Sequence, residues 1–164
     1  MDDFLFRPAT IADAPALGAL VLDLLPYLTI DPAGKGADEF VAHIDGAAQL
    51  RYLRQPNFRY RLATRQGKLA GFIALRDNSH LFHLFVGRSW HGQGLGRRLW
   101  ELARAEALAA GNPGVFTVNA SDHALPMYRR FGFEPTGPRE AQRGIAWTPM
   151  RLGSAGSPYR PAGD

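Results

Sequence analysis

The chain has 164 residues, no cysteine and a formal charge of +4 at pH 7. This length predicts a single domain that buries roughly two thirds of the surface of its unfolded chain, and the lack of cysteine excludes disulfides, thiolate metal ligands and a cysteine nucleophile. The basic residues are scattered rather than gathered in one stripe, which argues against a nucleic-acid partner. No apolar run approaches the roughly 20 residues of a membrane span, and the acidic N-terminus does not resemble a signal peptide. We therefore expect a cytoplasmic protein with no membrane partner.

The first third of the chain predicts one short strand and two helices. After an apolar strand over residues 4–9, apolar side chains recur at spacings of three and four, and Pro26 ends or kinks this first helix. A turn-rich loop follows over 28–36. A second helix is expected over 38–54, with one apolar face.

Five later segments have the composition or period of β-strands. They are residues 58–64, 69–75, 80–86, 115–118 and 144–152. The third of them is almost wholly apolar, which predicts a central position in the sheet. A helix is expected from Leu95 to Gly111, and a shorter one ends at Arg130 with Ser121 or Asp122 as its cap.

A glycine-rich stretch joins the central strand to the helix that follows it. Its residues of interest are His91, Gly92, Gln93, Gly94, Leu95, Gly96, Arg97 and Arg98. Glycines let the backbone approach a ligand, and the N–H groups of a first helical turn attract an anion. The stretch therefore predicts a pyrophosphate site, although a tight turn before a helix would have the same composition.

Two familiar phosphate loops do not fit this stretch. A Walker-type loop would continue from Gly96 with lysine and a hydroxyl residue, but two arginines follow. A dinucleotide fingerprint would need a third glycine at Arg97 or Leu99. The spacing His91-x-x-Gly94-x-Gly96 instead resembles the Gln/Arg-x-x-Gly-x-Gly/Ala loop of the GNAT superfamily of acyl-CoA N-acyltransferases, with histidine at its first position.

A second segment is similar to another signature of that superfamily. A predicted strand end is followed by Ala124, by Tyr128 four residues later, and then by Gly132 and Phe133. The two signatures occur in the family's order and are separated by one helix and one strand. The resemblance covers residues 4–152.

The resemblance implies one α/β (α+β) domain over residues 4–152. Its sheet would be mixed and mostly antiparallel, with about six to seven strands, about four flanking helices and a splay at the central strands. Residues 153–164, rich in glycine, proline and serine, would form a flexible tail. The resemblance also leaves a homodimer open.

The activity implied by the resemblance is N-acetyl transfer. An acetyl group would move from acetyl-CoA, without a metal, to a primary amine of a small molecule or peptide by direct attack in a ternary complex. The alternative is a catalytically silent acyl-CoA-binding regulatory module. The implied donor contacts are Phe85, Val86, His91, Gly92, Gln93, Gly94, Leu95, Gly96, Arg97, Arg98, Asn119 and Ser121.

Three side chains are candidates for moving protons. By the resemblance, Tyr128 lies near the thioester sulfur and protonates the departing thiolate, while a backbone amide near Phe85 or Val86 meets the oxyanion. His80 and His83 are candidate general bases, and water is the remaining alternative. Because side chains alternate along a strand, we expect at most one of the two histidines to face the acceptor.

The acceptor amine itself is not identified by the sequence. The resemblance implies that the loops over residues 27–38 and 137–144 wall the acceptor site. Neither loop carries a recognisable specificity motif.

Overall fold

The computed structural model describes residues 3–153, so the predicted tail lies, apart from Gly153, outside the described residues. The strands are β1 (Leu5–Pro8), β2 (Phe58–Arg65), β3 (Lys68–Arg76), β4 (His80–Val86), β5 (Phe116–Ser121), β6 (Glu134–Pro135), β7 (Glu140–Gln142) and β8 (Ile145–Leu152). The α-helices are α1 (Ala14–Asp23), α2 (Leu25–Leu28), α3 (Asp38–Val41), α4 (Gly46–Leu53), α5 (Leu95–Ala109) and α6 (Leu125–Arg130). None of these helices is long and apolar enough to cross a bilayer.

All the described strands belong to one sheet. Its order is β1-β2-β3-β4-β5-β8-β6, with β7 paired to β8 beside this path. Every pair is antiparallel except β4 with β5, which is parallel. The predicted mixed, mostly antiparallel sheet with β4 at its centre is therefore confirmed.

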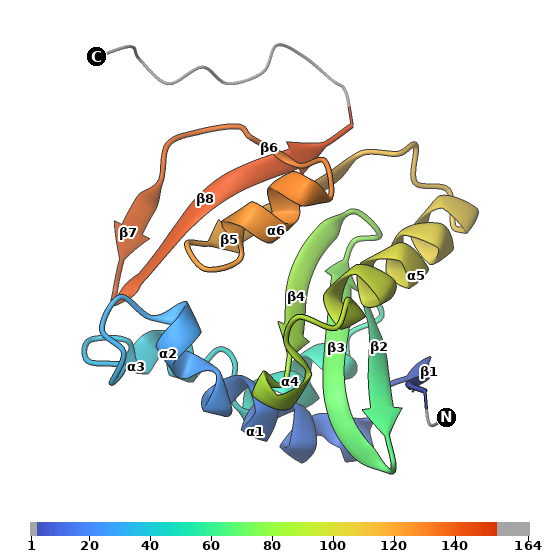
Figure 1. Ribbon diagram of the computed structural model, residues 1–164, viewed down its shortest axis with the longest axis horizontal. Helices are drawn as coiled ribbons and strands as arrows, with labels where there is room; N and C mark the ends of the chain where they lie inside the picture. Colours follow the sequence, from blue (N-terminus) through green and yellow to red (C-terminus); the bar gives the residue numbers. More distant parts are fainter. Residues whose placement is uncertain (1–2, 154–164) are drawn as a thin grey trace.

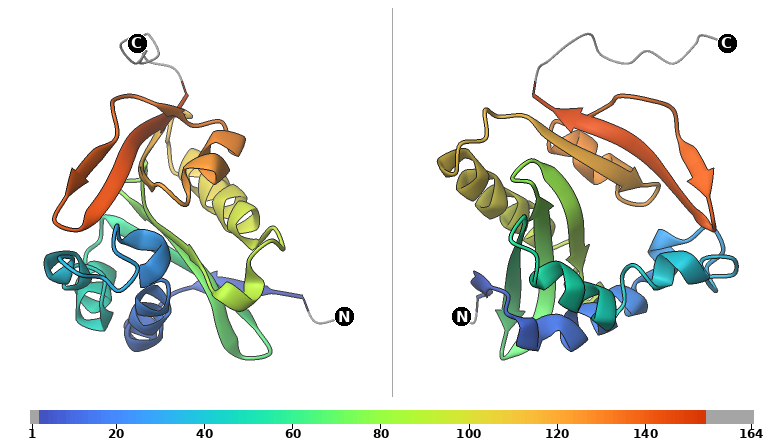
Figure 2. Two further views of the ribbon diagram at one scale, coloured as in Figure 1. Left: turned by 60° about the vertical axis from the view of Figure 1, so that its left-hand side comes forward. Right: turned by 180° about the vertical axis from the view of Figure 1, so that it is seen from behind.

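Helices pack on both faces of this sheet (Figure 1). α1 and α4 lie on the face of β2 and β3 and enclose a core that includes Leu17, Tyr60 and Phe72. α5 and α6 lie on the opposite face, over a second core around Leu99 and Phe116. Figure 2, from behind, shows α1 and α4 beside the β2–β4 half of the sheet and away from β5 and β8.

The single helix predicted over residues 38–54 is wrong, because α3 and α4 are separate helices. Asp45 has an extended backbone, and its carboxylate accepts a hydrogen bond from the Ala48 N–H at 2.9 Å, which starts a new helix. The next residue, Gly46, packs against Gly18 of α1 so closely that a Cβ on Gly18 would lie 2.3 Å from the Gly46 nitrogen. The break thus allows two helix backbones to touch.

Two strands, β6 and β7, and the division of the N-terminal helices were not predicted. β6 has two residues and β7 has three, mostly exposed, so neither is long enough to display a period. Both owe their pairing to β8, which is the longer strand.

Of the two predicted caps before α6, Ser121 is the one that caps. Its Oγ accepts a hydrogen bond from the Ala124 N–H, whereas Asp122 forms an ion pair with Arg139.

The sheet divides between its two central strands. β4 and β5 are paired only at His80 with Thr117 and at Leu81 with Val118. Beyond these two pairs the strands diverge, as Figure 1 shows. The splay implied by the resemblance is therefore present, and it opens toward the glycine-rich stretch.

Candidate active site

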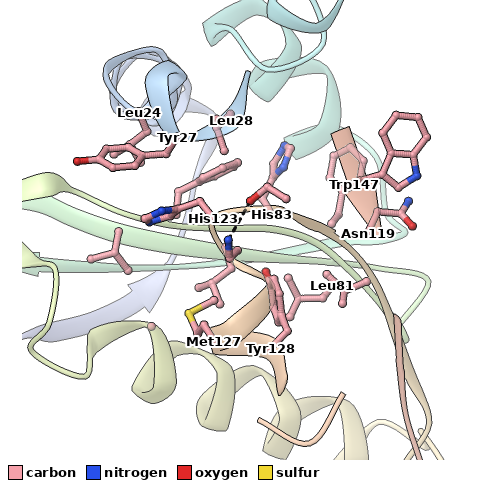
Figure 3. A pocket seen from close by; sticks show the side chains of 18 of the residues that line it. Leu24, Tyr27, Leu28, Leu81, His83, Asn119, His123, Met127, Tyr128 and Trp147 are labelled. Atoms are coloured by element: carbon pink, nitrogen blue, oxygen red, sulfur yellow. Dashed lines mark hydrogen bonds between the residues drawn. The ribbon is translucent and has the colours of Figure 1, made fainter. Parts of the chain in front are cut away.

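A cavity of about 890 Å³ occupies the gap between the diverging strands. Its walls come from β4, β5, α6 and the glycine-rich stretch on one side, and from α2 to α4 and β8 on the other (Figure 3). Most of the predicted site residues line it, including Tyr128, His80, His83 and Asn119. Two of them do not line the cavity: Gln93 and Arg98.

The glycine-rich stretch forms an open cradle of backbone at one end of the cavity. Gly92 and Gly94 have φ angles of 75° and 77°, and no atom lies within 4 Å of the position that a Cβ would take on either. Gly94 directly precedes α5, whose first-turn N–H groups have no partner within the helix. A cradle of this kind fits a phosphate group of an elongated ligand.

The two arginines that follow the cradle have different surroundings. Arg97 lines the cavity and lies over the Phe131 ring, 5.2 Å from its centroid. Arg98 donates a hydrogen bond to Asp3 at 2.8 Å and lies 4.9 Å from the centre of the Phe6 ring. Of the two, only Arg97 is placed where a ligand in the cavity can reach it.

Three aromatic rings meet across the mouth of the gap. Tyr27 of α2 packs against His91 of the cradle, with ring centroids 5.5 Å apart. It also packs against His123 of the β5–α6 loop at 4.6 Å, and Figure 3 shows this second pair. The His91 Nε2 is also hydrogen-bonded to the Val86 carbonyl oxygen, at 2.7 Å. Tyr27 is the first residue of the loop 27–38 that was expected to wall the acceptor site, whereas His123 was not predicted as a site residue.

The backbone of β4 offers donors to the gap at alternate residues. The Gly87 N–H donates to Ala70 of β3, and the Phe85 carbonyl also faces β3, beside Gly71. Backbone groups alternate in direction along an antiparallel strand, so those of Val86 and Leu84 face the gap. Of the two predicted amide candidates, Phe85 therefore directs its N–H to β3, and Val86 directs its N–H to the gap.

Tyr128 presents its hydroxyl to the cavity while its ring is held in the core. The side chain is 4% exposed and packs against Phe131 and Phe133. Within residues 3–153 its hydroxyl has no hydrogen-bond partner and is not sealed from solvent, and Figure 3 shows it directed toward the middle of the pocket. Burial raises the pKa of Tyr128, so the phenol stays protonated at neutral pH.

The expectation that His80 and His83 point to opposite faces is wrong. The β3–β4 register shifts between Ala74 and Leu75, which pair with His83 and Leu81, so Phe82 is an extra residue in β4. A bulge of this kind interrupts the alternation of side chains. Both histidines consequently line the cavity.

His83 is locked in a buried hydrogen-bond network. Tyr60 donates its hydroxyl proton to Gln49 Oε1 at 2.7 Å, and Gln49 Nε2 donates to the Ile44 carbonyl oxygen at 3.0 Å. These two partners fix the orientation of the amide, so its second N–H is directed to His83 Nε2 at 3.3 Å. The lone pair that a general base would need is therefore already in use.

The electrostatics of His83 agree with this assignment. Burial lowers the pKa of His83 to about 3, against a smaller opposite effect of a hydrogen bond with the Phe82 backbone. A second proton on the ring would also break its bond with Gln49. His83 thus has the features of a hydrogen-bonded core histidine rather than those of a general base.

This network predicts that acid destabilises the fold through His83. The unfolded histidine binds a proton near pH 6.5 and the folded one only near pH 3, so the unfolded state holds more protons between these values and stability falls as the pH falls. Between pH 7 and 5 the wild type should lose about 2 kcal/mol more unfolding free energy than His83→Asn. Urea titrations of both proteins at both pH values measure it, and equal losses would contradict the prediction.

His80 has a different environment at the narrow end of the splay. Its Nδ1 is 2.8 Å from Thr117 Oγ1, and its other ring nitrogen has no described protein partner. Burial and, to a lesser extent, Arg76 lower the pKa of His80 from its ordinary 6.5. The imidazole is therefore neutral at pH 7 and able to accept a proton.

The end of the cavity beyond His80 is aromatic. Tyr52 and Phe82 line it and pack edge to face, with ring centroids 4.9 Å apart. Of the two predicted loop walls, 27–38 contributes Tyr27 and Leu28, whereas 137–144 contributes no lining residue. The second loop instead holds the first in place.

Three contacts join the loop 27–38 and α3 to the β7–β8 turn and the first residue of β8. The Ile30 N–H donates to the Gly144 carbonyl at 2.9 Å, Thr29 bridges to Ile145, and Arg143 forms an ion pair with Glu39. They tie α2 and α3 to β8 across the open face of the sheet. The acceptor end of the cavity is closed on that side as a result.

Comparison with known proteins identifies the family. Residues 28–154 match the acetyltransferase (GNAT) domain family. The aminoalkylphosphonate N-acetyltransferase of Salmonella typhimurium is 34% identical over 114 residues, which are 64% of this chain and 67% of that protein. The chain therefore belongs to the GNAT family of acetyltransferases, and it is an acyltransferase.

Solved structures show the same fold. A GCN5-related N-acetyltransferase from Rhodopseudomonas palustris superposes with a TM-score of 0.73 at 25% identity, over 90% of this chain and 93% of that chain. The PaiA N-acetyltransferase of Thermoplasma acidophilum, solved with coenzyme A, has a TM-score of 0.72 at 16% identity, over 91% and 98% of the two chains. The fold and family expected from the two sequence signatures are confirmed.

Proposed function

We propose that this protein transfers the acetyl group of acetyl-CoA to a primary amine, with both substrates bound at once. The observation that supports this best is the single continuous cavity, which extends from the glycine cradle to the aromatic end beside His80. A shared cavity lets the amine reach the thioester directly. No acyl-enzyme is needed, and the chain has no cysteine that would form one.

The residues at the cradle end fit the donor. Backbone N–H groups of Gly92 to Gly96 and the first turn of α5 would hold its pyrophosphate, with Arg97 beside them. Val86 and Leu84 on β4, and Asn119 and Ser121 on β5, would flank its pantetheine arm. A coenzyme A complex of the PaiA relative, which shares this fold, supports the assignment.

The proposed chemistry needs one base and one acid. Acetyl-CoA supplies a thioester whose carbonyl carbon bonds to the amine nitrogen while the C–S bond breaks and coenzyme A leaves as a thiol. His80 accepts the first proton, which the ammonium must lose before it can attack, and Tyr128 donates the proton that the departing sulfur takes up. The second proton that the nitrogen loses as the amide forms restores the Tyr128 hydroxyl. The Leu84 or Val86 N–H donates to the carbonyl oxygen as it becomes negative.

The proposal includes no metal, nucleic-acid or membrane partner, and it places the enzyme in the cytoplasm. The lack of cysteine is consistent with a reducing compartment. Aminoalkylphosphonates belong in any acceptor panel, because the Salmonella typhimurium relative is named for them.

The test is release of free thiol from acetyl-CoA in the presence of a panel of amines. Thiol release that depends on the amine, with the acetylated amine found by mass spectrometry, is the expected result. Acetyl-CoA binding without turnover on any amine would instead indicate the silent regulatory module.

The role of His80 predicts a change in pH dependence. In the wild type, kcat/KM for the total amine should fall on the acid side with an apparent pKa below 6.5, because His80 must be neutral to accept the ammonium proton and its pKa is lowered. His80→Ala should lose this acid limb and about 10²-fold of rate, whereas His83→Asn should keep it. Steady-state profiles from pH 5 to 8 decide between them, and an unaltered limb in His80→Ala would assign the proton to water.

A further inference from the structure

The charges that line the cavity are all of one sign. In the part of the chain that the structure describes, the lining contains Arg76, Arg97 and Arg130, and it contains no aspartate, glutamate or lysine. Arg97 lies at the cradle and Arg130 on α6. Arg76, at the end of β3 beside the first residue of β4, is the arginine of the acceptor end.

The positive charge of Arg76 is only weakly neutralised by its neighbours. Its carboxylate partner is Asp77, at 3.6 Å, and the two side chains are 41% and 63% exposed. Exposed ion pairs of this kind contribute little and exchange readily. The guanidinium lies over the ring of Phe82, 5.6 Å from its centroid, which holds it at the cavity wall.

Aromatic rings surround the space beside this guanidinium. Tyr52, Phe58 and Phe82 form a packed trio with centroid distances of 4.9 to 5.1 Å. The Tyr52 hydroxyl already donates to the His43 carbonyl oxygen at 2.9 Å, so its ring is the part that offers an apolar surface. Trp147, which pairs with Ser121 of β5, also lines the cavity.

We propose that the acceptor is a primary amine with an aromatic or similarly bulky apolar body and one anionic group, and that Arg76 binds that anion. This inference rests on the proposed function and names its substrate class. If the acceptor carried a second positive charge, that charge would be repelled by the Arg76 guanidinium, and no carboxylate in the cavity lining would offset the repulsion. Polyamines and aminoglycosides are excluded on that ground.

A matched series of small amines tests the proposal. Phenylalanine has the aromatic body and a carboxylate, and phenylalanine amide has the same body without the negative charge. In 1-amino-2-phenylethylphosphonate a phosphonate replaces the carboxylate. The diamine 1,5-diaminopentane carries a second positive charge instead of an anion. We expect kcat/KM to be highest for one of the two anionic compounds and lowest for the diamine. The carboxylate and phosphonate arms show which anion the site prefers.

Arg76 variants separate its role from the differing basicity of the amines. In Arg76→Gln the ratio of kcat/KM for the anionic amine to that for its amide should fall roughly 10- to 100-fold, since a hydrogen-bonded charge pair is lost. Arg76→Lys keeps a charge and should retain part of the ratio. Arg59→Gln is the control, because Arg59 lies on β2, bonds to Asn78 and does not line the cavity.

The outcomes distinguish the inference from the function on which it rests. A diamine preference, or a ratio that Arg76→Gln leaves unchanged, would overturn the inference while acetyl transfer stands. Failure of every amine to release thiol would overturn the proposed function as well. Thermal melts of all three variants verify that the fold is kept, and Arg76→Lys provides the answer if Arg76→Gln does not fold.

Discussion

Replacement of Tyr128 by phenylalanine should lower kcat by about 10²- to 10⁴-fold. The substitution keeps the ring against Phe131 and Phe133 and removes only the hydroxyl that faces the cavity. Because that hydroxyl has no described protein partner, no hydrogen bond of the fold is lost. Affinity for acetyl-CoA should barely change, and steady-state kinetics with calorimetry measure both quantities.

Tyr60→Phe is the matched control for this experiment. It also deletes a buried phenol, but one that donates to Gln49 and does not line the cavity. Its cost should appear in the unfolding free energy, at about 1 to 3 kcal/mol, and only weakly in kcat. A Tyr128→Phe enzyme of full speed would mean that the thiolate leaves unaided or takes its proton from water.

Replacement of Gly94 by valine should weaken acetyl-CoA binding by on the order of 100-fold or more, since several charge-assisted hydrogen bonds are lost together. Its φ of 77° is a conformation that a β-branched residue avoids, so the cradle must rearrange and turn its N–H groups away from the phosphate. A Cβ added at Gly94 meets no atom within 4 Å, so we expect the rest of the fold to stay in place. Isothermal titration with acetyl-CoA measures the effect.

Gly67→Val provides the same strain elsewhere. Gly67 lies at the tip of the β2–β3 hairpin with a φ of 74° and equally open space around its Cβ position. Both variants should lose similar thermal stability, and only Gly94→Val should lose affinity. If Gly94→Val bound acetyl-CoA as tightly as the wild type, the cradle would not be part of the donor site. His91→Gln should be tolerated, because glutamine is common at this position in the family.

The parts of the site that lie on local motifs could be predicted from the sequence. The cradle depends on glycines at fixed spacing, and Tyr128 follows a signature within one short helix, so both were placed without knowledge of long-range contacts. The apolar run of β4 likewise predicted its central position, which the strand order confirms.

The remaining features depend on contacts between distant segments. The bulge at Phe82 is a property of the β3–β4 register, and no residue pattern in β4 reveals it. Gln49 sits in a helix as an ordinary polar residue, and its function appears only when Tyr60 and His83 come within reach. Arg76 is one of many arginines until its position at the cavity wall is known.

The divergence of β4 and β5 after two residue pairs gives the sheet four edges where an open sheet has two. Edge strands normally invite pairing with other chains, but these two inner edges face each other inside one molecule, where a second protein cannot enter. Only a thin chain with amide groups of its own can lie between them. The melting temperature should therefore rise with the concentration of such a ligand, because its binding joins two half-sheets whose strands are otherwise paired at two positions.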